Sequence, residues 1–293
     1  MTGILWGLCA ALFIGGSDCI ARVTAQRVSV VVLFLIIMGL SLATLSVWLF
    51  ATDNWPPWDA HAWAASAVSG LLNLVALYFL YKALAHGPVA VASPAASTFT
   101  VLLVAFNVLN GEPWSWLQVV AIVIVFAGVA MLTLPTDADK NKKHYDARWL
   151  QRTALLGLAA ALAVAFRMFL AQEAGSALGA MHALYLNRAF AMLGAVVLLA
   201  VCLTRRQQLV WPTGGMKKLV ILQAIFETAA LAFFLIGSAN GGRITATIGF
   251  SVFAAATAVF AWIWLAEPIG WQRGGWILLI GFGIMLAVVG NPT

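Results

Sequence analysis

The chain has 293 residues, of which 63% are hydrophobic and only 9% are charged. A soluble protein carries roughly 25% charged residues, and one core of this size cannot hide so much apolar surface from water. A soluble protein is therefore excluded, and we expect the chain to lie in a membrane. The net charge of +6 would suggest nucleic acid in a soluble protein. In a membrane protein the positions of the bases matter more than their sum, and we expect no nucleic-acid partner.

Ten apolar runs divide the chain. A membrane-spanning helix needs about 20 mostly apolar residues, and the runs are apolar on all sides rather than alternating as in the strands of a membrane β-barrel. The predicted helices lie at residues 3–21, 28–51, 63–85, 88–109, 114–134, 150–171, 178–203, 217–238, 243–265 and 270–290. We therefore predict an all-α integral membrane protein with ten transmembrane helices and no soluble domain.

The basic residues predict the orientation of these helices. If the ten helices alternate in direction, 13 of the 16 Lys and Arg residues fall on one side and only Arg243 falls on the other. The remaining two, Arg167 and Arg188, fall within helices, and Arg167 lies close enough to a predicted helix end for its charge to reach the interface. Cytoplasmic loops are enriched in bases. We expect a multi-pass protein of the inner (cytoplasmic) membrane, with both termini outside.

The two halves of the sequence repeat. A shift of 155 residues aligns Glu112 with Glu267, each followed by proline, and a shift of 150 aligns Gly7 with Gly157. Each half holds five predicted helices, and because five is odd, the second half must enter the membrane from the opposite side. Inverted repeats are typical of secondary transporters. We predict a first five-helix repeat at 1–135, a cytoplasmic linker at 136–148 and a second, inverted repeat at 149–293.

Ionisable side chains inside a span are costly and are therefore functional candidates. Glu227 and Arg188 both lie near mid-depth at 1.5 Å per residue, so one interpretation is a purely structural ion pair. The other is that Glu227 meets a proton or the amino group of a substrate. Asp18 lies four residues before Arg22, and we expect the two side chains to form an i,i+4 ion pair at the helix end, which would account for a carboxylate there without a function. Asp18 is kept as a candidate proton or ion-pair residue.

Uncharged polar and aromatic side chains complete the candidate cavity. The amide of Asn73 needs partners in hydrocarbon, and Tyr78 and Tyr81 offer flat apolar faces with polar tips. Stripes of serine, threonine or aromatic residues often serve only packing, but a cavity for an indole or phenyl ring is built from the same residues. The candidate substrate-cavity residues are Asn73, Tyr78, Tyr81, Ser97, Phe99, Glu227, Phe250 and Ser251.

Several motifs resemble those of the drug/metabolite transporter superfamily, EamA type. They are the Trp6-Gly7 opening, the Ala83-Leu84 end of the third helix, Pro94 in a hydroxyl-rich fourth helix, and the two Glu-Pro hinges. The length and aromatic content are similar to those of the bacterial aromatic amino acid exporter branch. The resemblance implies a basket of helices around a central cavity. It also implies a secondary transporter that exports small metabolites, aromatic or hydrophobic amino acids among them, by alternating access.

Other classes of function find little support in the sequence. There is no Walker A, HExxH or GxSxG motif, so we expect no catalytic residue, no metal site and no cofactor. An ion channel would need a filter of carbonyl groups or a ring of like charges, and the sequence shows neither. A role as a receptor or structural protein would not explain an inverted duplication. A multidrug or hydrophobic-cation exporter, or a transporter of another small metabolite, stays open as the alternative. We expect a monomer, with the substrate and the lipid bilayer as its partners.

Overall fold

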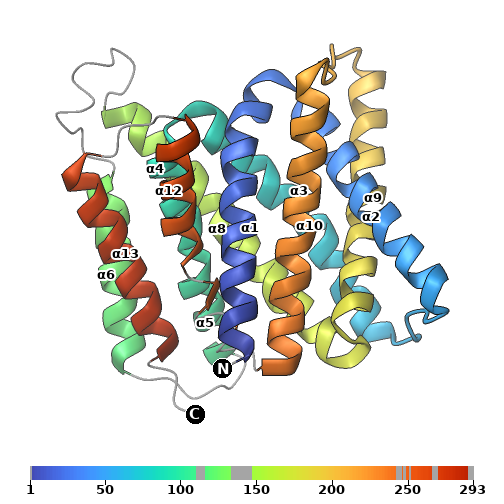
Figure 1. Cartoon of the computed structure of the whole chain (residues 1–293), viewed down its shortest axis with the longest axis horizontal. Helices are drawn as coiled ribbons and strands as arrows, with labels where there is room; N and C mark the ends of the chain where they lie inside the picture. Colours follow the sequence, from blue (N-terminus) through green and yellow to red (C-terminus); the bar gives the residue numbers. More distant parts are fainter. Residues whose placement is uncertain are drawn as a thin grey trace.

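The structure is a computed structural model that describes residues 2–109, 116–132, 147–241, 246, 249–250, 252–265 and 270–289. Within these ranges the chain is helical and contains no strand. The long helices lie side by side and run between the same two ends of the molecule, whereas α4 and α5 each cover only part of this length (Figure 1). In chain order they are α1 (Thr2–Arg27), α2 (Val30–Thr52), α3 (Ala60–His86), α4 (Val89–Ser97), α5 (Phe99–Leu109), α6 (Trp116–Leu132), α8 (Ala147–Leu178), α9 (Ala180–Thr204), α10 (Gly215–Gly241), α12 (Phe253–Leu265) and α13 (Trp271–Val289).

Among the described residues, six helices are long and apolar enough to cross a membrane. These are the Leu5–Arg27, Val30–Thr52, Ala60–His86, Arg148–Leu178, Ala180–Thr204 and Gly215–Asn240 segments. Shorter apolar helices lie at Val91–Leu103 and Gly274–Gly283. This is the architecture of a multi-pass, all-helical membrane protein, while the count of ten spans and their inverted arrangement stay predictions. Most of the predicted 136–148 linker, both Glu-Pro hinges and Ser251 lie outside the described residues.

The helix predicted at 88–109 is two helices, α4 and α5, separated at Thr98. Pro94 lies within α4, and a proline has no N–H to donate and its ring clashes with the preceding turn. Side-chain hydroxyls bind the backbone carbonyls around the break: Ser97 donates to Pro94 O at 2.7 Å and Thr98 to Ala95 O at 2.9 Å. The hydroxyl stripe of this segment therefore supports its backbone.

The described helix junctions gather at two ends of the bundle. At one end, Ser29 N donates to Val210 O at 3.1 Å, and the rings of His86 and Trp149 stack with centroids 4.4 Å apart. Nine basic residues belong to the helix ends and loops that meet here: Arg22, Arg27, Lys82, Arg148, Arg152, Arg205, Arg206, Lys217 and Lys218. We call this the basic end. At the opposite end, the His182 ring is 2.7 Å from the carbonyl oxygen of Asn54.

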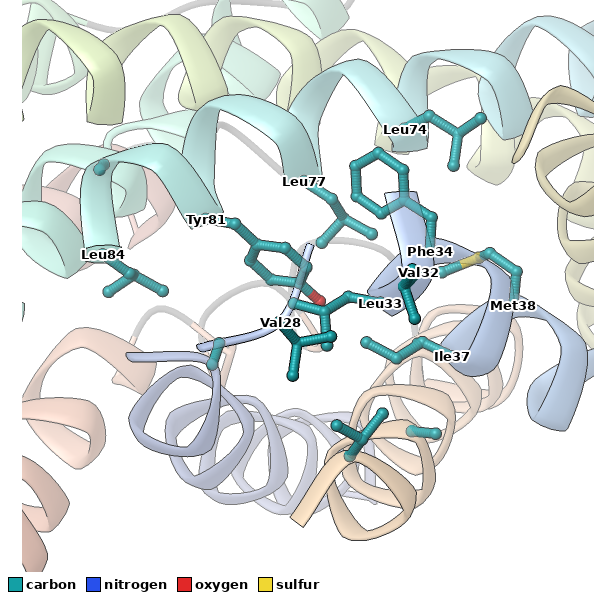
Figure 2. Packing of buried hydrophobic residues seen from close by; sticks show 14 of the residues in the cluster. Val28, Val32, Leu33, Phe34, Ile37, Met38, Leu74, Leu77, Tyr81 and Leu84 are labelled. Carbon is teal, nitrogen blue, oxygen red and sulfur yellow. The ribbon is translucent and has the colours of Figure 1, made fainter. Parts of the chain in front are cut away.

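The helices pack in extensive pairs, α1 with α10, α3 with α8, α2 with α9 and α6 with α13. Figure 2 shows one apolar cluster, in which Tyr81 of α3 points toward Leu33 and Phe34 of α2. Glycines permit the closest approaches. A Cβ on Gly157 of α8 would lie 2.7 Å from Ala95 Cβ of α4, and a Cβ on Gly7 of α1 would collide with the carbonyl oxygen of Ala246.

Candidate functional site

A cavity with a volume of about 70 Å³ lies inside the bundle. Its lining comes from α1, α3, α4, α5, α8, α9, α10, α12 and Phe250, so residues far apart in the sequence meet around one space. The volume holds a few water molecules. The lining is mostly apolar but includes two arginines and two carboxyl side chains, which is a small number of polar groups in an apolar cavity, as is typical of ligand sites.

The cavity brings together seven of the residues that the sequence singled out: Asp18, Asn73, Tyr81, Phe99, Arg188, Glu227 and Phe250. Tyr78 does not line it. Tyr78 is 41% exposed on the outer surface, and the Lys82 ammonium lies 5.0 Å from its ring centroid. Lys82 thus contacts this ring rather than an acidic group in the cavity. Ser97 is buried, and its hydroxyl bonds to the backbone as described above.

Arg188 and Glu227 form an ion pair inside the bundle. Arg188 Nη1 lies 3.2 Å from Glu227 Oε1, and the two side chains are 1% and 7% exposed. The same Nη1 contacts Met38 Sδ at 3.2 Å, and Asn73 Nδ2 donates to this sulfur at 3.4 Å. Met38 of α2, labelled in Figure 2, therefore connects Asn73 to the pair. The Nε of Arg188 and the Oδ1 of Asn73 are buried and have no hydrogen-bond partner among the residues that the structure describes.

Asp18 lies in the cavity rather than at a helix end. The sequence placed Asp18 near the end of a helix predicted to stop at residue 21, but α1 continues to Arg27. Asp18 is nine residues, or about 14 Å, from that end. It is buried and accepts a hydrogen bond from Ser93 Oγ of α4 at 3.4 Å. Arg22 donates to the backbone carbonyl of Leu84, which connects the ends of α1 and α3.

Arg167 is a cavity residue that sequence reasoning placed at the membrane interface. The predicted helix ended at 171, but α8 continues to Leu178, so Arg167 is 11 residues, or about 16 Å, from the helix end. It lines the cavity, and within the described part of the chain its buried Nε and Nη1 have no hydrogen-bond partner. Two polar residues, Gln172 and Glu173, directly follow the predicted helix end. Because α8 continues through them, Arg167 lies deeper in the membrane than predicted.

Four phenylalanines form an aromatic wall of the cavity. Phe99, Phe234, Phe250 and Phe253 all line it. The ring centroids of Phe234 and Phe250 are 5.1 Å apart, those of Phe250 and Phe253 are 5.3 Å apart, and the Phe99 ring is 5.8 Å from each of the latter two. These spacings are those of interacting aromatic pairs. Phe234 and Phe253 were not among the predicted site residues.

A chain of buried hydrogen bonds lies between the cavity and the basic end. Thr24 Oγ1 donates to Gln223 Oε1 at 2.7 Å, and Gln223 Nε2 donates to Tyr81 Oη at 2.8 Å. These three side chains are at most 1% exposed and join α1, α10 and α3. The sequence analysis missed Thr24 and Gln223, which are single polar residues in apolar runs. These hydrogen bonds therefore tie three helices together on this side of the cavity.

A second cavity, with a volume of about 330 Å³, lies near the opposite end of the bundle. Its lining comes from the last turns of α8 and α10 and the first residue of α9: Gln172, Gly175, Ser176, Ala180, Leu235, Ser238 and Ala239. Gln172 is one helical turn beyond Met168, which lines the central cavity. The larger space is therefore on the side away from the basic end. In the described part of the chain, no group of three His, Cys, Asp or Glu residues is placed to hold a metal ion.

Comparisons with known proteins agree with this architecture. Residues 1–134 match the model of the EamA-like transporter family. A crystal structure of a protein with 17% sequence identity aligns over 99% of this chain and 97% of its own, with a TM-score of 0.69, a likeness that concerns the fold alone. No curated protein matches the chain. The family match covers the predicted first half-repeat of the chain, residues 1–134, and points to a membrane transporter of small molecules of the EamA-like type.

Proposed function

We propose that the chain is a secondary transporter that exports aromatic or hydrophobic amino acids by alternating access. The observation that carries this proposal is the central cavity itself, in which a wall of four phenylalanines faces the same space as Asp18, Arg167 and the Arg188–Glu227 pair. The phenylalanine wall suits the apolar ring of an aromatic amino acid, and the charged side chains suit its ammonium and carboxylate groups. Charged side chains at this depth in a membrane are costly, which makes them candidates for a functional role.

The packing supports the proposed inverted repeat. Under the repeat, α1 and α3 of the first half correspond to α8 and α10 of the second. The contact of α1 with α10 then corresponds to the contact of α8 with α3, and both are extensive. The aligned glycines also have equivalent surroundings, because Gly7 meets Ala246 before α12 and Gly157 meets Ala95 in α4. Two halves of this kind permit one to rock against the other around a central site.

The unequal ends of the bundle support alternating access. The Thr24–Gln223–Tyr81 chain joins three helices between the cavity and the basic end, whereas the larger second cavity lies near the other end. If the basic end is cytoplasmic, as the distribution of bases predicts, this arrangement is closed toward the cytoplasm and more open toward the outside. An exporter passes through such a state when it releases its substrate.

The proposed orientation has both termini outside and the 136–148 linker in the cytoplasm. It is tested by introducing Thr2→Cys and, separately, Lys142→Cys into a variant without the three native cysteines. An impermeant thiol reagent applied to intact cells should label the first variant, and the second only after the cells are opened. Labelling of only the Lys142→Cys variant in intact cells would overturn the orientation.

The second candidate is export of hydrophobic cations. It is favoured by two carboxyl side chains, Asp18 and Glu227, which line the cavity together with aromatic rings. Carboxylates and the faces of aromatic rings both attract cations. Purified protein in liposomes separates the two functions. Radiolabelled phenylalanine and a fluorescent hydrophobic cation are compared, with protein-free liposomes as the control. Saturable flux of phenylalanine supports the amino acid proposal, and flux of the cation alone rejects it.

A further inference from the structure

The two carboxyl and two guanidinium side chains of the cavity come from different pairs of helices. Asp18 of α1 and Glu227 of α10 line the same cavity. Glu227 pairs with Arg188 of α9, and Arg167 of α8 interacts with both members of that pair. The carboxyl groups are therefore toward α1 and α10, and the guanidinium groups are toward α8 and α9. Two carboxyl groups and two guanidinium groups balance in formal charge.

Within this set, the two arginines differ in their partners. Arg188 has Glu227 at 3.2 Å, whereas the described contacts of Arg167 leave its Nε and Nη1 without a hydrogen-bond partner although both atoms are buried. A buried, unsatisfied charged donor is expensive. The backbone at this level is held in place, because Ser69 Oγ donates to Arg167 O and accepts from Asn187 Nδ2, both at 2.8 Å. Arg167 thus extends from a backbone segment that is held in place, and its Nε and Nη1 are unused by the described residues.

We propose that Arg167 binds the carboxylate of a zwitterionic substrate, an α-amino acid. The inference rests on the proposed transport function and adds a residue and a chemical requirement to it. A guanidinium presents a planar fork of donors that matches a carboxylate. Arg188 lines the same cavity, and its Nε is also without a hydrogen-bond partner among the described residues. The ammonium group then faces the Asp18 side of the cavity, and the ring of the ligand faces the phenylalanine wall. A zwitterion also leaves the charge balance of the cavity unchanged.

The ligand side of the test uses the unmodified protein. Binding of phenylalanine and of phenylalaninamide, which keeps the ammonium group but has no carboxylate, is measured by calorimetry on the purified protein. Hydrogen bonds to charged groups contribute about 1.5–3 kcal/mol, so the amide is expected to bind roughly 10- to 100-fold more weakly. The same comparison of leucine with leucinamide measures the contribution of the carboxylate to binding in a ligand without an aromatic ring.

The protein side of the test uses Arg167→Gln, with Arg152→Gln as a matched control. Arg152 is on the same helix but is exposed at the basic end. Arg167→Gln should lose roughly 10- to 100-fold in affinity for phenylalanine and bind phenylalaninamide as the wild type does, while Arg152→Gln should change neither. If Arg167→Gln does not fold, Arg167→Lys is used, which keeps the charge but not the fork and should lose part of the carboxylate preference.

The results separate this inference from the proposed function. Equal binding of the acid and the amide by the wild type would overturn the role of Arg167 but leave aromatic amines or cations as substrates. Carboxylate-dependent binding of leucine without any binding of phenylalanine would support Arg167 and reject the aromatic substrate. If no amino acid binds, or if Arg167→Gln weakens acid and amide alike, the inference is rejected.

Discussion

Breaking the Arg188–Glu227 pair should have unequal effects that depend on which partner is removed. The charges are 3.2 Å apart and almost fully buried, which corresponds to a gross attraction of about 5 kcal/mol at an effective dielectric constant of about 20. Desolvation offsets much of this in the wild type, but removing one partner leaves the other charge buried, which costs about 3–5 kcal/mol.

The neighbouring Arg167 predicts the direction of the inequality. In Arg188→Leu, Glu227 keeps Arg167 as a nearby opposite charge, so the loss should be at the lower end of this range, about 3 kcal/mol. In Glu227→Leu, the two guanidinium groups face each other without that carboxylate, and the loss should approach about 5 kcal/mol. The double variant Arg188→Leu/Glu227→Leu should recover most of the stability, because no member of the pair is left unpaired.

The assay is unfolding of the purified protein in mixed micelles, followed by the fluorescence of its 13 tryptophans, together with flux in liposomes. Single variants that each lose less than about 1 kcal/mol, or a double variant as unstable as the sum of the singles, would refute the electrostatic reasoning. Glu227→Gln keeps the shape of the side chain, so a stable variant without flux would indicate a functional carboxylate. A stable and active double variant would eliminate the functional assignment of Glu227.

Two further predictions concern packing and closure. Gly157→Ala should lower the free energy of unfolding by about 1–2 kcal/mol, because its Cβ would lie 2.7 Å from Ala95 Cβ. Gly175→Ala on the same helix meets nothing within 4 Å and should raise stability by up to about 1 kcal/mol, so equal effects would contradict the close contact. Tyr81→Phe leaves the buried Gln223 amide without its 2.8 Å partner and should cost about 1–3 kcal/mol. Tyr78→Phe on the outer surface should stay within about 0.5 kcal/mol of the wild type, and a loss equal to that of Tyr81→Phe would refute the role of the hydrogen-bond chain.

The sequence was sufficient to predict the class of fold, because the hydrophobic runs are long and leave little ambiguity. It was least reliable at helix ends. The helices predicted to end at 21 and 171 continue to Arg27 and Leu178, because polar residues near a membrane interface do not stop a helix. These two errors account for the misplacement of Asp18 and Arg167, which are near mid-depth in the longer helices.

Side-chain direction was the other limit. Tyr78 and Tyr81 are three residues apart on α3, yet Tyr81 faces the cavity and Tyr78 faces outward. Both faces of a membrane helix are apolar, so hydrophobic periodicity does not indicate which side is inside. The partners of Thr24 and Gln223 are on three different helices, and only the packing of those helices brings them together.

The most direct test of the proposed transport is flux of radiolabelled phenylalanine by the purified protein in liposomes, with and without an imposed pH gradient and with no ATP. The proposal predicts saturable flux above that of protein-free liposomes, inhibited by unlabelled tryptophan and tyrosine. Acceleration by the gradient would indicate proton coupling, and insensitivity would indicate facilitated diffusion. Flux no greater than in protein-free liposomes for phenylalanine, tryptophan, tyrosine and leucine would contradict an aromatic or hydrophobic amino acid transporter.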